Sequence, residues 1–180
     1  MTTATPKTYA KHRNDIRTGD LILFESKDII SRMVSWKTKS TITHAAMAFW
    51  LEQPLRNQRL FILESVLTGL SLNYLSNRVA WYLPHGDMYW HKILPKFQEM
   101  GPTAANVLLK NVGTFYDFKD LIVQSITRVT INPSKLFCSE AVAFAWKDIA
   151  GLPDDFVAPY PSEMTGERLG VYEKEGIKIT

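Results

Sequence analysis

The sequence predicts an α+β fold, in which an antiparallel sheet packs against helices. Two observations lead to this prediction. In the front half, two short apolar runs at 43–50 and 59–66 have the length and separation of a β-hairpin. In the back half, apolar residues recur at helical spacing, which predicts helices over 102–113, 120–129 and 138–150. No repeat and no second compositional block divides the chain, so we expect a single domain.

Composition restricts the classes of function. The 180 residues are 46% apolar and 22% charged, which is typical of a folded domain. The net charge is +3 without a long basic run, so nucleic-acid binding is not expected, and any attraction to membranes or other anionic surfaces should be weak. A single cysteine excludes an internal disulfide. The polar start lacks the apolar core of a signal peptide, and no apolar run could span a membrane, so a cytosolic or virus-encoded protein is expected.

The predicted elements follow one another in a simple order. Residues 1–16 are small, polar and basic without a period, so we expect an N-terminal tail before a domain over 17–180. A turn at Gly19-Asp20 leads into a short apolar run at 21–24, which has the length of a buried strand. The other predicted elements are a helix over 26–36, a strand at 79–83, a strand or loop at 88–94 and an edge strand within 171–179.

The only cysteine, Cys138, stands at the start of the last predicted helix. The unpaired N–H groups of a helix N-terminus carry a partial positive charge, which lowers the pKa of a thiol and makes it nucleophilic. A free cysteine is more often a small buried hydrophobic residue, and taken alone this second interpretation is favoured. The choice therefore depends on what the fold brings to Cys138.

His44 and Glu64 interrupt apolar surroundings in the two strands of the predicted hairpin. If the hairpin turns about Pro54, they lie directly opposite each other, with Cβ atoms about 5 Å apart. A register slip of one residue would place them on opposite faces. A hydrogen-bonded strand-end histidine and a solvent-facing glutamate are the alternatives, although a buried carboxylate without a partner would be costly.

Together these three residue types can perform nucleophilic catalysis. An imidazole takes the proton of a thiol, and a carboxylate on the other ring nitrogen fixes the tautomer and stabilises the imidazolium. An N–H group at the start of the Cys138 helix could hold an oxyanion. The histidines and carboxylates have no recognisable metal-ligand spacing, so neither a metal nor another cofactor is expected.

Four short motifs occur in a set order along the chain. They are Gly19-Asp20-Leu21-Ile22-Leu23-Phe24, Thr43-His44-Ala45-Ala46-Met47, Leu63-Glu64-Ser65-Val66 and Phe137-Cys138-Ser139-Glu140-Ala141-Val142. With Tyr116-Asp117-Phe118 before the cysteine, this order resembles the circularly permuted branch of the NlpC/P60 papain-like superfamily, especially the YiiX/YebB-like cysteine amidases and peptidases. Ordinary NlpC/P60 domains have the cysteine before the glycine–aspartate strand and the histidine, whereas here it follows them. The resemblance covers roughly residues 17–165.

The resemblance implies a permuted papain-like fold with a helix bearing Cys138 packed on an antiparallel sheet. It further implies Cys138 as the nucleophile, His44 as the general base and Glu64 as the third member of the triad. By the same analogy, Tyr116 and Asp20 would lie nearby as substrate-binding residues. Residues 69–100 have no counterpart that we can place, and we expect them to shape the substrate groove.

Three functions remain open from the sequence. The leading one is a cysteine hydrolase that cleaves an amide bond of a peptide, a cell-wall peptide or an acyl-amide through a thioester acyl-enzyme. The second is a lipid acyltransferase or thioesterase of the same fold, with exposed aromatic residues between Trp81 and Trp90 at a lipid interface. The third is a non-catalytic binding or virion-associated domain. The oligomeric state is not predicted.

Overall fold

The computed structural model describes residues 6–26, 40–51, 58–66, 69–113 and 137–180. Within these residues the protein is built on a six-stranded sheet in the order β4-β3-β2-β1-β5-β6, with antiparallel pairing throughout. The strands are β1 (Leu21–Ser26), β2 (Ile42–Leu51), β3 (Arg59–Val66), β4 (Gly69–Tyr74), β5 (Gly86–His91) and β6 (Ile177–Lys178). The helices are α1 (Lys7–His12), α3 (Leu75–Tyr82), α4 (Gly101–Leu109), α6 (Phe137–Trp146) and the 3₁₀ turns η1 (Pro95–Met100) and η2 (Pro161–Glu163).

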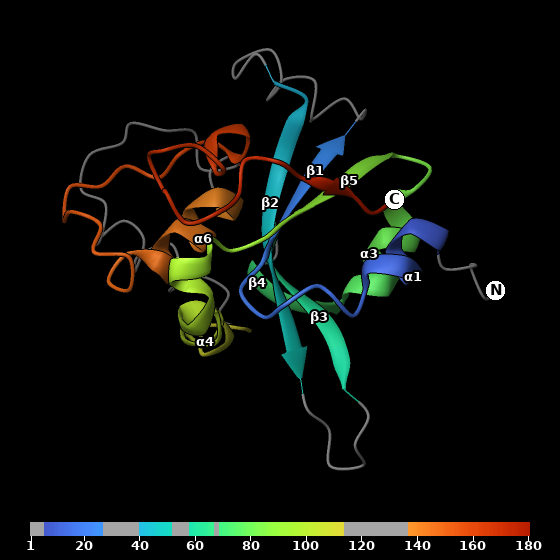
Figure 1. The fold of residues 1–180 in the computed structure, drawn as a ribbon, viewed down its shortest axis with the longest axis horizontal. Coiled ribbons are helices and arrows are strands. Elements are labelled where there is room, and N and C mark those ends of the chain that lie inside the picture. Colours follow the sequence, from blue (N-terminus) through green and yellow to red (C-terminus); the bar gives the residue numbers. More distant parts are fainter. Residues whose placement is uncertain (1–5, 27–39, 52–57, 67–68, 114–136) are drawn as a thin grey trace.

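Helices cover both faces of the sheet. Figure 1 shows α4 and α6 on one side of the central strands and α1 and α3 on the other. Because side chains alternate along a strand, Leu21 and Leu23 pack with α4 and α6, whereas Ile22 and Phe24 pack with α1 and α3. This two-sided burial explains why β1 begins as an uninterrupted apolar run.

The structure confirms the α+β class and the main predicted strands. The run at 21–24 lies in β1, the predicted hairpin is formed by β2 and β3, and the C-terminal stretch adds the short edge strand β6. The predicted strand or loop at 88–94 overlaps β5, and the helix predicted over 102–113 is α4, which ends earlier, at Leu109. The helices predicted over 26–36 and 120–129 lie outside the described residues, apart from the first residue of the former.

The expectation of an aperiodic tail over residues 1–16 is wrong for its second half. Residues 7–12 form α1, and the side chains of Tyr9 and Ile16 are buried against the sheet. The indole Nε1 of Trp50 also donates a hydrogen bond to the Ile16 carbonyl at 2.7 Å. Two apolar anchors in a polar stretch are too few to show a period, but they are enough to hold one short helix.

The strand predicted at 79–83 is also wrong, because most of this stretch belongs to helix α3. The buried side chains of α3 are Leu75, Val79 and Tyr82, which follow helical spacing. The aromatic and branched residues at its end suggested a strand. Residues 69–100 are therefore no separate insertion, since they supply β4, α3, β5 and η1 to the main body of the fold.

Candidate active site

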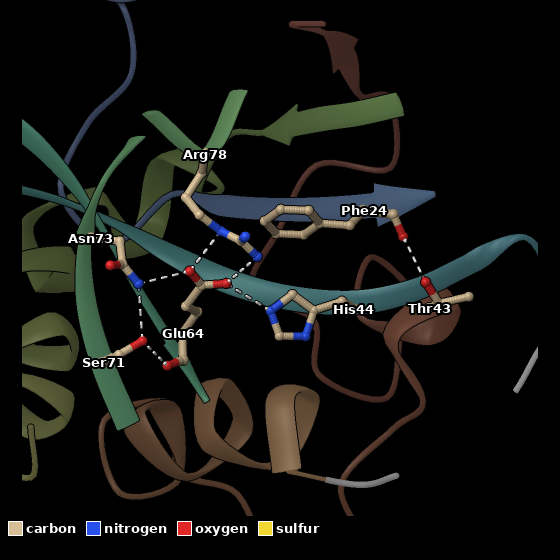
Figure 2. A network of polar contacts seen from close by, with 7 residues as sticks. All are labelled: Phe24, Thr43, His44, Glu64, Ser71, Asn73 and Arg78. Atoms are coloured by element: carbon tan, nitrogen blue, oxygen red, sulfur yellow. Dashed lines mark hydrogen bonds and ion pairs between the residues drawn. The ribbon is translucent and has the colours of Figure 1, made fainter. Parts of the chain in front are cut away.

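His44 and Glu64 meet on neighbouring strands, although not as directly opposed residues. The β2–β3 pairing runs from Leu51↔Arg59 to Met47↔Leu63, so the hairpin is centred on residue 55 rather than on Pro54. Continued by one residue, this register sets Glu64 beside Ala46, and His44 lies two residues further along β2. A shift of two residues keeps both side chains on the same face, as the sequence predicted. His44 Nε2 lies 3.1 Å from Glu64 Oε2 (Figure 2).

The carboxylate of Glu64 is held by nitrogen donors on both oxygens. Arg78 of α3 approaches Oε1 through Nε at 2.8 Å and donates from Nη2 to Oε2 at 2.9 Å. Asn73 of β4 donates from Nδ2 to Oε1 at 3.0 Å, and Figure 2 shows these groups converging with His44 on one carboxylate. Burial alone would raise the pKa of Glu64, but His44 and Arg78 outweigh it and hold this pKa below its usual value. Glu64, which is only 1% exposed, is therefore a buried anion with a full set of partners.

The imidazole of His44 lies between this carboxylate and the thiol of Cys138, with which it is also hydrogen bonded. Its side chain is 20% exposed, and its ring packs edge-on against Phe24 with 4.8 Å between ring centroids. Burial disfavours the charged ring, but the negative charges of Cys138 and Glu64 prevail and raise the pKa of His44 to about 9. Since Nε2 faces Glu64, Nδ1 is the ring nitrogen left for the sulfur.

Cys138 occupies the first turn of α6, as the sequence predicted, and is 6% exposed. Burial acts to raise the pKa of its thiol, but the His44 charge and hydrogen bonds from the backbone of Ala45 and Ser139 lower it overall. The lowered pKa of the thiol and the raised pKa of the imidazole favour a thiolate–imidazolium pair near neutral pH. Such a pair can attack an electrophilic carbon and then supply a proton.

Asp20 is a buried hydrogen-bond acceptor that holds the turn before β1 in place. Its Oδ2 accepts hydrogen bonds from the Arg17 backbone N–H at 2.8 Å and from Trp90 Nε1 at 2.7 Å. Its Oδ1 accepts one from the Ile93 N–H at 3.0 Å, and the residue is 2% exposed. With both oxygens engaged, Asp20 joins the turn before β1 to the neighbouring strand β5 and to the segment that follows it, and this geometry does not support its expected role in substrate binding. Tyr116, the other expected substrate-binding residue, lies outside the described residues.

The turn beside Asp20 also requires glycine. Gly19 has φ +96°, and a Cβ atom there would lie 2.6 Å from the Cα of Gly101, at the start of α4. The Gly19-Asp20 motif is thus explained by a close backbone contact and a buried hydrogen-bond acceptor.

Sequence reasoning missed Arg78 and Asn73 as parts of the site. The sequence offered no signal for Arg78, because α3, the helix that carries it, was not predicted. Glu140 was also missed: it lies in the first turn of α6, and burial raises its pKa to about 7.

The aromatic residues expected at a lipid interface differ in their exposure. Trp81 is 57% exposed, whereas Trp90 is buried.

The described residues form neither a cluster of potential metal ligands nor a helix that could cross a membrane. Among them, no group of three or more histidine, cysteine, aspartate or glutamate side chains is arranged to hold a metal ion. The helices in the same part of the chain are too short or too polar to cross a membrane.

Comparison with known proteins identifies a structural neighbour. No protein-family model matches the chain, and no curated protein matches its sequence. The crystal structure of the metalloprotein YiiX from Escherichia coli O157:H7, assigned to DUF1105, superposes with a TM-score of 0.50. The match covers 76% of this chain and 67% of YiiX at 19% sequence identity. The chain shares the fold of YiiX. This result agrees with the resemblance to YiiX-like proteins that the sequence motifs indicated. At 19% identity it shows a shared fold and nothing about activity.

Proposed function

We propose that this YiiX-like protein is a cysteine hydrolase that cleaves an amide bond, with a circularly permuted papain-like arrangement of its site. Cys138 is the nucleophile, His44 the general base and Glu64 the residue that orients His44. The observation that supports the proposal is the position of the His44 ring, which is hydrogen bonded to the Glu64 carboxylate and to the Cys138 thiol. This is the order of contacts that a nucleophile, a base and an orienting carboxylate require.

In the acylation step, the Cys138 thiolate attacks the carbonyl carbon of the substrate and forms a carbon–sulfur bond. The negative charge moves to the carbonyl oxygen, where N–H groups at the start of α6 can stabilise it. When the tetrahedral intermediate collapses, the carbon–nitrogen bond breaks and the imidazolium of His44 protonates the leaving amine. The products of this step are a free amine and a thioester on Cys138.

In the deacylation step, neutral His44 accepts a proton from water, and the resulting hydroxide attacks the thioester. The carbon–sulfur bond then breaks, which releases the carboxylic acid and restores the thiolate beside the imidazolium. Glu64 stays ionised throughout, since Arg78 and Asn73 also hold its carboxylate. The raised pKa of His44 keeps the ring charged until the leaving group needs its proton.

The description of YiiX as a metalloprotein raises the question of a metal ion here. Glu64 is unsuited as a ligand, because its two oxygens already accept from a guanidinium, an amide and an imidazole. A cation at this carboxylate would also be repelled by Arg78. Glu64 is therefore not available as a metal ligand, and the proposed reaction uses no metal ion.

Acyl transfer from p-nitrophenyl acetate tests the proposal without knowledge of the natural substrate. We expect an acetyl thioester on Cys138, detected by intact-protein and peptide mass spectrometry, followed by turnover. Cys138→Ala and His44→Ala should abolish the adduct, whereas His85→Ala, a change at an exposed histidine outside the site, should not. Acylation of other residues alone, or equal turnover by Cys138→Ala, would refute the proposal. A panel of peptide and fatty-acyl p-nitroanilides then separates peptide from acyl-amide specificity.

A further inference from the structure

A depression in the surface lies beside the Glu64 contacts, at the junction of β4 and α3. It is a pocket of about 420 Å³, which is within the usual size range for small-molecule sites. Its lining includes Phe61, Asn73, Tyr74, Asn77, Arg78 and Trp81. Asn73 and Arg78 both also contact the Glu64 carboxylate, whereas neither His44 nor Cys138 is among the residues that line the pocket.

Two aromatic rings of this pocket are supported by the protein and still exposed. The Arg78 guanidinium lies over the Trp81 ring, 5.1 Å from its centroid, and Trp81 is 57% exposed. Tyr74 is 42% exposed and stacks on Phe61 with 4.5 Å between centroids and 28° between planes. Both rings are therefore held in place on one side and present apolar surface to a ligand on another, which limits the ordering cost of binding.

The lining of the pocket also includes polar groups. The Nδ2 of Asn73 donates to Glu64 and Ser71, which leaves its Oδ1 as an acceptor, and Figure 2 shows this oxygen pointing away from Glu64. Asn77 adds an exposed amide that can both donate and accept. The charge of Arg78 is compensated by Glu64 at 2.8 Å, so the pocket has little preference for an anion.

We propose that this pocket binds a saccharide, with one ring stacked on Trp81 or Tyr74 and its hydroxyls bonded to Asn73 and Asn77. A β-1,4-linked pyranose has equatorial hydroxyls and an apolar face of C–H groups. That face complements the electron-rich face of an aromatic ring, and the hydroxyls match amides, which donate and accept at once. A lipid chain would leave the amides of the pocket without partners, which is costly. The proposal depends on the pocket and is independent of the hydrolase activity.

Titration calorimetry of the full chain carrying Cys138→Ala tests this inference, since that change removes the proposed nucleophile. The probes are cellotetraose and chitotetraose, with tetra-alanine and phosphatidylcholine–phosphatidylglycerol vesicles as the competing ligand classes. We expect at least one saccharide to bind, and Trp81→Ala and Asn77→Ala each to weaken it about tenfold or more. Leu83→Ala, at an exposed residue of the same region outside the pocket lining, should leave the affinity unchanged.

Three outcomes would overturn the proposal: binding of neither saccharide, an affinity in both pocket variants that is unchanged from that of the parent protein, or preferential binding of the peptide or the vesicles. The Asn77→Ala variant guards against misinterpretation of Trp81→Ala, because Asn77 is exposed and its truncation leaves the packing around Arg78 in place. Failure here would leave the acetyl-thioester experiment unaffected.

Discussion

The imidazole of His44 and the carboxylate of Glu64 meet across a diagonal of the β2–β3 hairpin, with 3.1 Å between Nε2 and Oε2. Directly opposed residues have Cβ atoms about 5 Å apart, whereas diagonal neighbours are about 7–8 Å apart. The longer separation provides room for a ring and a carboxylate to meet end to end. It also places His44 beyond the last β2–β3 pair, Met47↔Leu63, where the start of α6 can reach the ring.

Replacing Glu64 by glutamine should reduce both reactivity and stability. Without the carboxylate charge the imidazolium is less favoured, so the thiolate population falls, and a change of one pKa unit corresponds to a factor of about ten. We therefore expect alkylation of Cys138 by iodoacetamide at pH 7 to slow about tenfold. Arg78 loses its ion pair but is partly exposed, so we expect a loss of roughly 2–4 kcal/mol in the free energy of unfolding, measured with urea. An unchanged alkylation rate in folded protein would contradict the assigned role of Glu64.

The pH profile of Cys138 alkylation should differ from that of a free thiol. Because the thiol pKa is lowered, the alkylation rate should rise at a lower pH than that of a free thiol, whose pKa is about 8.5. A further change is expected near pH 9, where His44 loses its proton. His44→Ala should return the profile to a single step at or above the free-thiol value. If the wild-type profile also showed only a single step at or above the free-thiol pKa, the thiolate–imidazolium pair of Cys138 and His44 would not form.

Stability at acid pH should also depend on Glu64. Its pKa is lowered in the folded protein from an ordinary value of 4.5, so its contribution to stability is present above that pH and is lost as the pH falls through the folded value. The difference in free energy of unfolding between wild type and Glu64→Gln should therefore narrow between pH 6 and pH 3. A constant difference would mean that the ionised carboxylate contributes little.

Asp20→Asn should destabilise the fold without altering the chemistry of the thiol. The amide replaces a charged acceptor of three hydrogen bonds and points two N–H donors at other donors, which should cost about 2–4 kcal/mol. Urea unfolding measures this loss, and the alkylation rate of Cys138 in the folded protein should change less than twofold. Lost turnover at full stability would instead support a role for Asp20 in substrate binding.

Gly19→Ala tests the close approach between the turn before β1 and the start of α4. A Cβ atom would meet backbone atoms of Gly101, which cannot rotate away, and φ is +96°. We expect a loss above about 2 kcal/mol. Gly151→Ala is the matched control, because its φ is +64° but a Cβ atom there meets nothing within 4 Å. It should cost about 1–2 kcal/mol, the penalty of the left-handed conformation alone. Equal losses would show that the contact with Gly101 is unimportant.

Local patterns were sufficient to predict the central sheet and the helix that carries Cys138. An apolar run, a proline-containing loop and a returning run define the hairpin without tertiary information. The same reasoning failed for α3, where a short segment with branched and aromatic residues allows both strand and helix, and packing decides. It also failed for α1, which is stabilised by two buried anchors rather than by its own period.

The candidate site was predictable in its residue types and not in its contacts. His44 and Glu64 could be assigned to one face because a hairpin restricts the register, but the two-residue offset depends on the loop between the strands. The meeting of Cys138 with His44 depends on how α6 docks, which no local pattern encodes. Arg78 stayed unrecognised for the same reason, since its partner Glu64 lies on a different element and the helix that carries Arg78 was itself not predicted.

The helix that carries the sulfur and the helix that carries Arg78 lie on opposite faces of the sheet, since α6 covers one face and α3 the other. A fluctuation that lifts α6 would therefore separate the thiol from the imidazole while the Arg78–Glu64–His44 contacts persist. In such a molecule His44 would still be oriented by Glu64, but no thiol would lie beside it. The activity would then depend on the equilibrium between the docked and undocked positions of α6, and it would be lost before heat or denaturant unfolds the sheet.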